Sequence, residues 1–298
     1  MRKLFDVFAG NYSERHNFSV YYPASLDYPR DHSVMFITSA FAGKAHRLSG
    51  VRSCIIFCPH TLELPQGVSE YNLILRADDP RTAYCLFFRE NHITNVPIKE
   101  SVQLIDGAYI ADTAVLGENV TIMPLAYIGG EVTIGNHVYI GSGVKLIGRV
   151  HIGDYVVIRE NTVIGADGLS TNRDPQGKAA TMPQFGGVTI MDHVQIGALS
   201  VIARGAIDDT VIGSGSKIDN STFISHNVKI GNDTFIVGET ILFGGATVGE
   251  QSFISGNSTV RNKCRIGSRS FIGMGSVVTK DVDDGSIVCG NPVRLIQK

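Results

Sequence analysis

The sequence predicts a mainly β protein built as a parallel β-helix of hexapeptide repeats, with a small α/β domain before it. Twenty-five aliphatic residues recur every six positions, from Ile110 to Ile164, from Ile190 to Ile202 and from Ile212 to Val278. A Val, Ala, Ser, Thr or Cys lies two residues before each of them, and Gly often follows directly. The α/β domain is expected because this repeat is absent from about the first hundred residues.

The spacing of the aliphatic residues is incompatible with an α-helix. A step of six residues turns a helix by roughly 600°, so successive aliphatic side chains would point in different directions. On a strand, by contrast, residues i−2 and i lie on the same side. Each unit therefore offers one small and one large inward side chain and then a corner. Three units complete a triangular coil of eighteen residues, and stacked coils enclose a continuous apolar core.

Two domains are expected, at residues 1–98 and 99–298. In the first, residues 34–38 and 54–58 are apolar runs typical of buried strands. A helix is expected to begin at an acidic cap, with Pro80 in its first turn.

The repeat is interrupted twice. Residues 165–189 contain a stretch with loop composition, and four extra residues enter between Ile202 and Ile212. A regular solenoid gains no stability from such excursions, so we expect them to shape a functional site. Tolerated surface loops are the alternative.

Composition excludes several classes of function. The net charge is −2 at pH 7, which does not favour nucleic acid or an anionic membrane as a partner. No apolar run reaches the roughly 18 residues of a transmembrane helix, and Asp6 comes too early for a secretory signal. Five cysteines, an odd number, predict reduced thiols and a cytoplasmic protein. Cys264 occupies a small core position, and packing is also the favoured role of Cys54 and Cys58 over a zinc site.

His226 is the histidine most suggestive of catalysis. It lies two residues after Ile224, at a corner, and Gly244 occupies the same corner one coil later. Stacked coils are about 4.8 Å apart, and a glycine allows a substrate carbonyl to approach the backbone N–H. A base next to an oxyanion donor suits the attack of an amine or hydroxyl on a thioester. The alternative is a hydrated surface histidine.

Several segments of the chain resemble a known family. They are Val163–Gly168, Pro183–Val188, Arg204–Gly213, Lys217–Asn220 and His226–Gly231. Hexapeptide repeats of this kind resemble the left-handed β-helix acyltransferases, which work as homotrimers with active sites between subunits. Within that group, nearly the whole chain resembles the UDP-3-O-acylglucosamine N-acyltransferases of lipid A synthesis. The resemblance implies a left-handed helix, a homotrimer and no metal.

The same resemblance implies roles for individual residues. His226 matches the general base, and the Gly244 amide matches a donor that holds the oxyanion. The first domain resembles a uridine-binding domain in which Phe36 matches the aromatic that stacks on uracil. Ser39 lies where the family has Asn, and Lys263 lies where it has a second histidine, so both positions depart from the pattern.

The acyl donor is predicted from the last coils. Residues 275–282 and 285–293 resemble the ending of CoA-using hexapeptide acetyltransferases, whereas the lipid A enzymes carry a helical extension that engages acyl carrier protein. Asn262 and Lys280 continue the corner column of His226 and are expected to line a groove for pantetheine and its phosphates. A solvated turn is the alternative for Lys280.

The predicted function is an N-acyltransferase of surface polysaccharide synthesis. It is expected to transfer an acyl group, in the first instance acetyl from acetyl-CoA, to the amine of a UDP- or dTDP-linked amino sugar. The alternative is the lipid A reaction, in which a 3-hydroxyacyl chain comes from acyl carrier protein. The amino sugar, its reacting amine and the acyl length remain open, as does the acid that orients His226, for which Asp208 and Asp209 are the nearest candidates.

Three other classes of protein fit the sequence less well. A γ-type carbonic anhydrase needs three histidines that converge on a metal. Here His137 and His193 fall three residues after an aliphatic, whereas His151 falls one before and His226 two after. A purely structural β-helix would leave the two interruptions and the first domain without a role. A nucleotidyltransferase needs a larger Gly-rich first domain.

Overall fold

The computed structural model describes residues 4–7, 16–94 and 99–297. The chain divides into two compact units, Met1–Val96 with Leu169–Phe185, and Pro97–Gly168 with Gly186–Lys298. The domain boundary predicted near residue 98 falls on 95–98, outside the described residues. The long interruption of the repeat belongs to the first unit.

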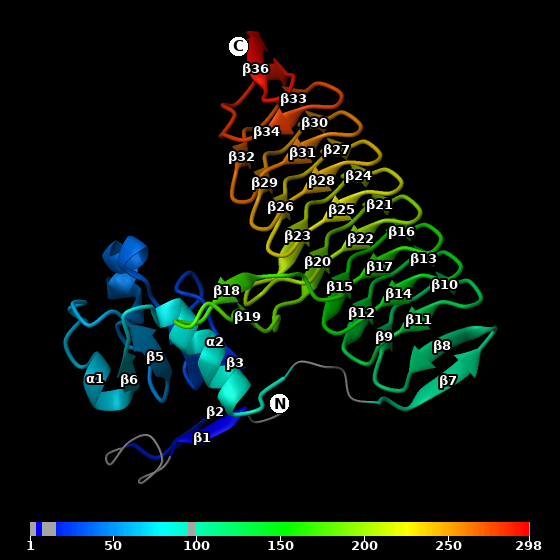
Figure 1. Ribbon diagram of the computed structural model, residues 1–298. Coiled ribbons are helices and arrows are strands. Elements are labelled where there is room, and N and C mark those ends of the chain that lie inside the picture. The colour runs from blue at the N-terminus through cyan, green and yellow to red at the C-terminus, as the bar shows by residue number, and fades with distance from the viewer. Residues whose placement is uncertain (1–3, 8–15, 95–98, 298) are drawn as a thin grey trace. The chain divides into compact units, whose positions relative to one another are not determined.

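The second unit is a parallel β-helix with three sheets, as the six-residue repeat predicts (Figure 1). Aligned strands are 18 residues apart, for example Phe223 with Ile241 and Ile224 with Leu242. The two interruptions lengthen single coils without breaking the register, since Ile164 still pairs with Ile202 and Ile202 with Ile224.

Each face of the helix is one sheet. Sheet 1 consists of β7 (Val102–Ile105), β8 (Ala108–Ala111), β11 (Tyr127–Ile128), β14 (Lys145–Leu146), β17 (Val163–Ile164), β22 (Val201–Ile202), β25 (Phe223–Ile224), β28 (Ile241–Leu242), β31 (Thr259–Val260) and β34 (Val277–Val278). Sheet 2 consists of β9 (Val115–Leu116), β12 (Val132–Ile134), β15 (Val150–Ile152), β20 (Val188–Ile190), β23 (Thr210–Ile212), β26 (Lys229–Ile230), β29 (Thr247–Val248) and β32 (Arg265–Ile266). Sheet 3 consists of β10 (Thr121–Ile122), β13 (Tyr139–Ile140), β16 (Val157–Ile158), β21 (Gln195–Ile196), β24 (Lys217–Ile218), β27 (Phe235–Ile236), β30 (Phe253–Ile254), β33 (Phe271–Ile272), β35 (Ile287–Cys289) and β36 (Arg294–Gln297).

The core of the β-helix is the stack of large aliphatic side chains together with the small residues beside them. Many of the small residues in the later coils are Ser or Thr, and their buried hydroxyls donate to backbone carbonyls. Thr222 Oγ1, for example, donates to Asp219 O at 2.9 Å and Ser252 Oγ to Gly267 O at 2.8 Å. These bonds remove the cost of burying a hydroxyl. Cys264 is buried in one of the small positions, as predicted.

The first unit has a four-stranded parallel sheet of β3 (Tyr22–Pro23), β4 (Ser33–Phe36), β5 (Ile55–Cys58) and β6 (Leu73–Arg76). Its other elements are the β1 (Phe5–Val7) and β2 (Phe18–Val20) pair, the 3₁₀ segment η1 (Ser39–Leu48), α1 (Val68–Tyr71) and α2 (Pro80–Glu90). Helix α2 begins as predicted, because the Asp79 side chain accepts hydrogen bonds from the N–H groups of Arg81 and Thr82.

The long interruption is a β-hairpin rather than a plain loop. Its strands are β18 (Thr171–Arg173) and β19 (Ala179–Thr181). Asn172 Nδ2 donates to Thr82 Oγ1 of α2 at 2.7 Å, and the rings of Phe185 and Phe88 lie 5.2 Å apart. The hairpin therefore packs within the first unit. In the described residues, no helix combines the length and apolarity needed to cross a bilayer.

Candidate active site

His226 lies at the corner between sheets 1 and 2, two residues after the inward Ile224 of β25. The strand pairing places Arg204 on one side of it in the column and Gly244 on the other. The eighteen-residue repeat predicts this stacking of His226 and Gly244.

Two glycines confine the imidazole. A methyl group placed on Gly244 would lie 2.5 Å from His226 Nε2, and one on Gly168 would lie 2.8 Å from His226 Cβ. The ring therefore rests against the backbone of the next coil, with Nε2 at the Gly244 side. Gly168 was not predicted, because it lies in the interruption, where the repeat gives no register.

Asn227 determines which imidazole nitrogen carries the proton. Its Oδ1 accepts from the Ala206 N–H at 3.0 Å, and its Nδ2 donates to Asp208 O at 2.8 Å, so the orientation of the amide is fixed. The same Oδ1 lies 3.1 Å from His226 Nδ1. Because this oxygen can only accept, Nδ1 carries the hydrogen of this contact. In the neutral form of the ring, Nε2 is then the nitrogen that can accept a proton.

The Asn227 amide contacts His226 Nδ1, and an orienting acid, for which Asp208 and Asp209 are the nearest candidates, stays a prediction. The sequence could have indicated Asn227, because it directly follows His226. In the structure it has a φ of 60°, a left-handed conformation that Asn tolerates. Asp208 contributes its backbone carbonyl to this arrangement. The Asp209 carboxylate is bound to Arg149 at 2.7 Å and also accepts from the Gly187 N–H and the Thr189 hydroxyl.

Asp209 ties the short interruption to the β-helix. Burial opposes its ionisation, but the Arg149 guanidinium and the two further donors outweigh this and lower the pKa of Asp209 below its ordinary value of 3.8. An acid with a lowered folded-state pKa stabilises the fold above its unfolded pKa. That contribution is lost as the pH falls through the folded-state pKa.

We expect Asp209→Asn to destabilise the protein by about 2 kcal/mol at pH 7, because Arg149, the Gly187 N–H and the Thr189 hydroxyl lose their charged acceptor. The difference from the parent protein should shrink as the pH falls from the unfolded-state pKa of about 4 through the lower folded-state pKa, where the parent carboxylate also becomes protonated. Urea unfolding at pH 7 and at low pH measures both effects. Asp208→Asn is the matched control, because Asp208 accepts from Asn227 through its backbone oxygen. Equal losses of stability in the two variants would contradict the role given to the Asp209 carboxylate.

The Gly244 amide is free to bind a ligand. Neighbouring corner groups are occupied, since Gly245 N–H donates to His226 O at 2.9 Å and Lys263 N–H to Gly244 O at 3.1 Å. Within the part of the chain that the structure describes, the Gly244 N–H donates to no other group. The imidazole of His226 and an uncommitted amide therefore lie on adjacent coils.

The other predicted residues lie in two places. Asn262 and Lys280 continue the same column and are exposed. Phe36 ends β4 in the first unit, where its half-buried ring lies 4.9 Å from that of Tyr84, and the exposed Ser39 follows at the start of η1. Ligands of parallel sheets typically bind at the carboxyl ends of the strands, which is where Phe36 lies.

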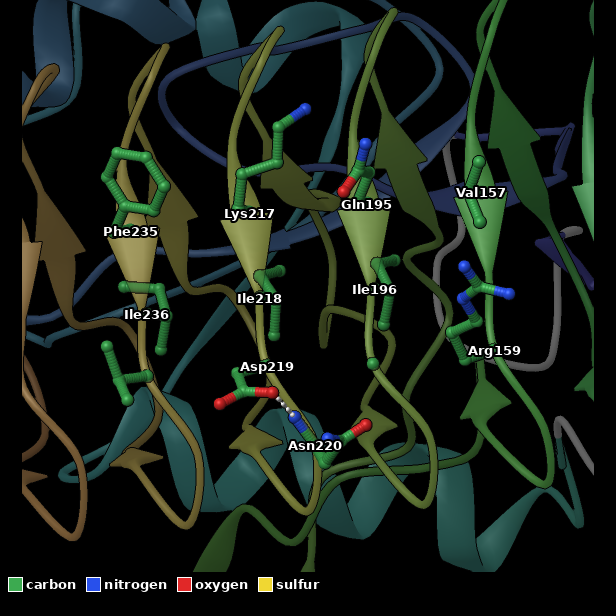
Figure 2. Close-up of a pocket in the computed structure, with 12 residues that line it drawn as sticks. Val157, Arg159, Gln195, Ile196, Lys217, Ile218, Asp219, Asn220, Phe235 and Ile236 are labelled. Atoms are coloured by element: carbon green, nitrogen blue, oxygen red, sulfur yellow. Dashed lines mark hydrogen bonds between the residues drawn. The ribbon is translucent and has the colours of Figure 1, made fainter.

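A groove of about 470 Å³ lies on the outer face of sheet 3, away from His226. Figure 2 shows Val157, Gln195, Lys217 and Phe235 side by side on successive strands along it. The only carboxylate that lines it, Asp219, accepts from the backbone N–H groups of the next residue and of Gly238. We therefore place the candidate active site at His226, where an imidazole lies next to the unpaired Gly244 N–H.

Histidines elsewhere do not converge. His137, Tyr155 and His193 form a stacked ladder with ring centroids 4.8 and 5.0 Å apart, on the corner between sheets 2 and 3. Over residues 4–7, 16–94 and 99–297, no group of three His, Cys, Asp or Glu side chains is arranged to hold a metal.

Comparisons with known proteins agree with the repeat. The family model described as bacterial transferase hexapeptide (six repeats) matches residues 113–148 and 131–166, and the GMPPB C-terminal domain matches 206–294. The chain is 51% identical over 85 residues to the UDP-3-O-acylglucosamine N-acyltransferase of Coxiella burnetii (strain RSA 493 / Nine Mile phase I), covering 28% of this chain and 25% of that protein. It is 48% identical over 79 residues to the enzyme of the same name from Francisella tularensis subsp. holarctica, covering 26% and 23%. The matched region spans about a quarter of these relatives.

Solved structures show the fold. The UDP-N-acetylglucosamine acyltransferase from Campylobacter jejuni is similar with a TM-score of 0.58 at 22% identity, over 65% of this chain and 73% of that one. The Arabidopsis UDP-N-acetylglucosamine acyltransferase gives 0.52 at 27% identity over the same shares. The predicted left-handed β-helix of hexapeptide repeats, which resembles those of acyltransferases, is confirmed.

Proposed function

We propose that this hexapeptide-repeat protein is an acyltransferase that transfers an acyl group from a thioester to the amine of a UDP-linked amino sugar. The observation that carries the proposal is the His226 corner, where the imidazole packs against Gly244, whose N–H donates to no described group. The relatives named above support the substrate class, since they are named as acyltransferases of UDP-linked glucosamine derivatives.

The proposed chemistry follows from the tautomer. As the sugar amine attacks the thioester carbonyl, His226 Nε2 takes its proton, and the Gly244 N–H holds the oxyanion that forms. The C–N bond is then complete, the C–S bond breaks, and the thiolate takes the proton from the imidazolium. Asn227 Oδ1 accepts from Nδ1–H throughout and stabilises the charged ring. No metal takes part in this proposal.

The comparisons support the alternative donor better than acetyl-CoA. The curated relatives reported above carry the name UDP-3-O-acylglucosamine N-acyltransferase, so we propose a 3-hydroxyacyl chain carried by acyl carrier protein as the first donor to test. Acetyl-CoA is the second candidate, because Asn262 and Lys280 continue the column beyond Gly244 and offer an amide and a cation to a phosphorylated pantetheine arm.

The remaining roles belong to the same proposal. Phe36 and Ser39 would recognise the uracil base in the first unit.

Assembly would be homotrimeric, with a second copy covering outer apolar side chains of sheet 3. These include Phe235, Phe253 and Phe271, whose rings form a ladder with centroids 5.8 and 5.3 Å apart. Phe235 and Phe271 are 49% and 41% exposed in the single chain, which makes this ladder suited to an interface.

A donor assay tests the function. Purified protein is given UDP-3-O-acylglucosamine with either 3-hydroxyacyl-acyl carrier protein or acetyl-CoA, and N-acylated product is measured by mass spectrometry. We expect product from the acyl carrier protein donor at a rate at least about 100-fold above a His226→Ala blank, the order of loss typical for a general base. Faster transfer from acetyl-CoA would favour the second candidate, and no transfer from either donor would contradict the proposal.

A further inference from the structure

Arg204 is a buried cation without an ion-pair partner. It occupies the corner column one coil before His226 and is only 7% exposed. Its Nε donates to Gly186 O at 2.7 Å. Among the described residues, no carboxylate forms an ion pair with it, whereas its neighbour Arg149 pairs with Asp209 at 2.7 Å. A buried charge of this kind costs free energy that a bound anion would offset.

The Nη1 and Nη2 end of the guanidinium lies against Gly148, where any larger residue would collide with it. A methyl group placed on Gly148 would lie 2.7 Å from Arg204 Nη1 and 3.2 Å from Nη2. The intervening residue of the column is the small Ala166, whose carbonyl accepts from the Arg204 N–H at 2.9 Å. Nη1 and Nη2 donate to no other described residue, so both groups can donate to a ligand. Nε is anchored, and the fork of N–H groups is held in one place.

We propose that Arg204 binds the diphosphate of the nucleotide-linked sugar; this inference rests on the proposed function. Arginine suits this ligand because its planar fork donates two parallel hydrogen bonds to phosphate oxygens. The position suits it as well. The guanidinium reaches past the Ala166 level toward Gly148, two to three coils from His226, which is about 10 to 14 Å at the usual strand spacing. A hexose with its amine at Nε2 and a diphosphate on the adjacent carbon can span this distance.

In this proposal, the two substrates bind to different parts of the corner column that contains His226. The coils beyond Gly244, with Asn262 and Lys280, would hold the thioester arm, and those before His226 would hold the phosphates of the acceptor. Burial lowers the pKa of the Arg204 guanidinium, and the charge of Asp167 acts in the opposite direction.

Binding measurements test the proposal independently of catalysis. Titration calorimetry with UDP, uridine and inorganic pyrophosphate is compared between the parent protein, Arg204→Gln and Gly148→Ala. We expect both variants to bind UDP roughly 10- to 100-fold more weakly, the loss of a charge-assisted hydrogen bond, and to bind uridine as the parent does. Gly148→Ala keeps the arginine but places a methyl group where its Nη1 lies. Gly275→Ala is its matched control, since both glycines have a left-handed φ (+64° and +66°) and a methyl group on Gly275 meets nothing within 4 Å. Arg269→Gln, at an exposed corner, controls for charge.

The outcomes separate the two proposals. UDP binding unchanged in both variants would overturn the role of Arg204. An equal loss of UDP and uridine binding in Arg204→Gln, with unchanged circular dichroism and melting temperature, would also overturn it, because the phosphates would then not be the group recognised. If the parent binds pyrophosphate through Arg204 but neither UDP nor uridine, the anion site stands and the proposed acceptor is wrong. If the parent binds none of the three ligands, both are wrong.

Discussion

Replacing His226 with Ala should lower the rate of acyl transfer by roughly 10²- to 10⁴-fold while leaving the fold intact. The loss is expected because the imidazole is the proposed base and its Nε2 lies against Gly244. The fold should persist because the imidazole lies outside the apolar core, which is formed by the aliphatic stack. Single-turnover acylation with saturating donor measures the chemical step directly.

A matched histidine variant separates catalysis from general damage. His151 lies on the outer side of β15, exposed to solvent, so His151→Ala should leave both the rate and the melting temperature unchanged. A His226→Ala protein that retains more than a tenth of the parent rate would remove the general-base assignment. Loss of the same size in His151→Ala would show that the assay reports stability rather than chemistry.

The sequence was sufficient to predict the β-helix because its rule is local and repeats. A six-residue spacing determines which side chains point inward, and so the pairing of Ile224 with Leu242 follows without any tertiary information. The placement of Gly244 beside His226 follows for the same reason. The start of α2 was predictable on equally local grounds, since Asp79 and Pro80 are characteristic of a helix N-terminus.

Features inside the interruptions could not be predicted in this way. Gly168 contacts His226 and Asp209 binds Arg149, but both lie where the chain leaves the repeat, so spacing no longer gives their neighbours. Residues 171–181 have turn composition, and their pairing as a hairpin depends on packing against α2, which a local pattern does not contain. Asn227 differs from these. It was overlooked because an acid was expected next to the imidazole, although an amide oxygen is an equally good acceptor for Nδ1–H.

Gly244→Ala should reduce acyl transfer at least about 100-fold without altering any polar group. The added methyl would lie 2.5 Å from His226 Nε2, closer than real contacts allow, so the ring must turn away or the corner must shift. Either change removes Nε2 from the position next to the Gly244 N–H, and a misplacement of about 1 Å is enough for such a loss. Gly244 does not have a left-handed φ, so alanine fits its backbone and the melting temperature should change by only a few degrees.

Gly256→Ala is the matched control for this variant. It lies two residues after Ile254, at the corner between sheets 3 and 1, and its methyl would lie 3.2 Å from the Gly238 carbonyl oxygen and 3.5 Å from Val237 Cγ1. It should therefore transfer acyl groups at the parent rate. The double variant His226→Ala/Gly244→Ala tests whether the two residues act together. If the glycine acts by holding the imidazole next to an oxyanion donor, the second substitution adds little to the loss of rate that the first one causes. Fully additive losses would mean that the two residues serve separate functions, and an active Gly244→Ala protein would show that the close packing of the ring is not needed for the reaction.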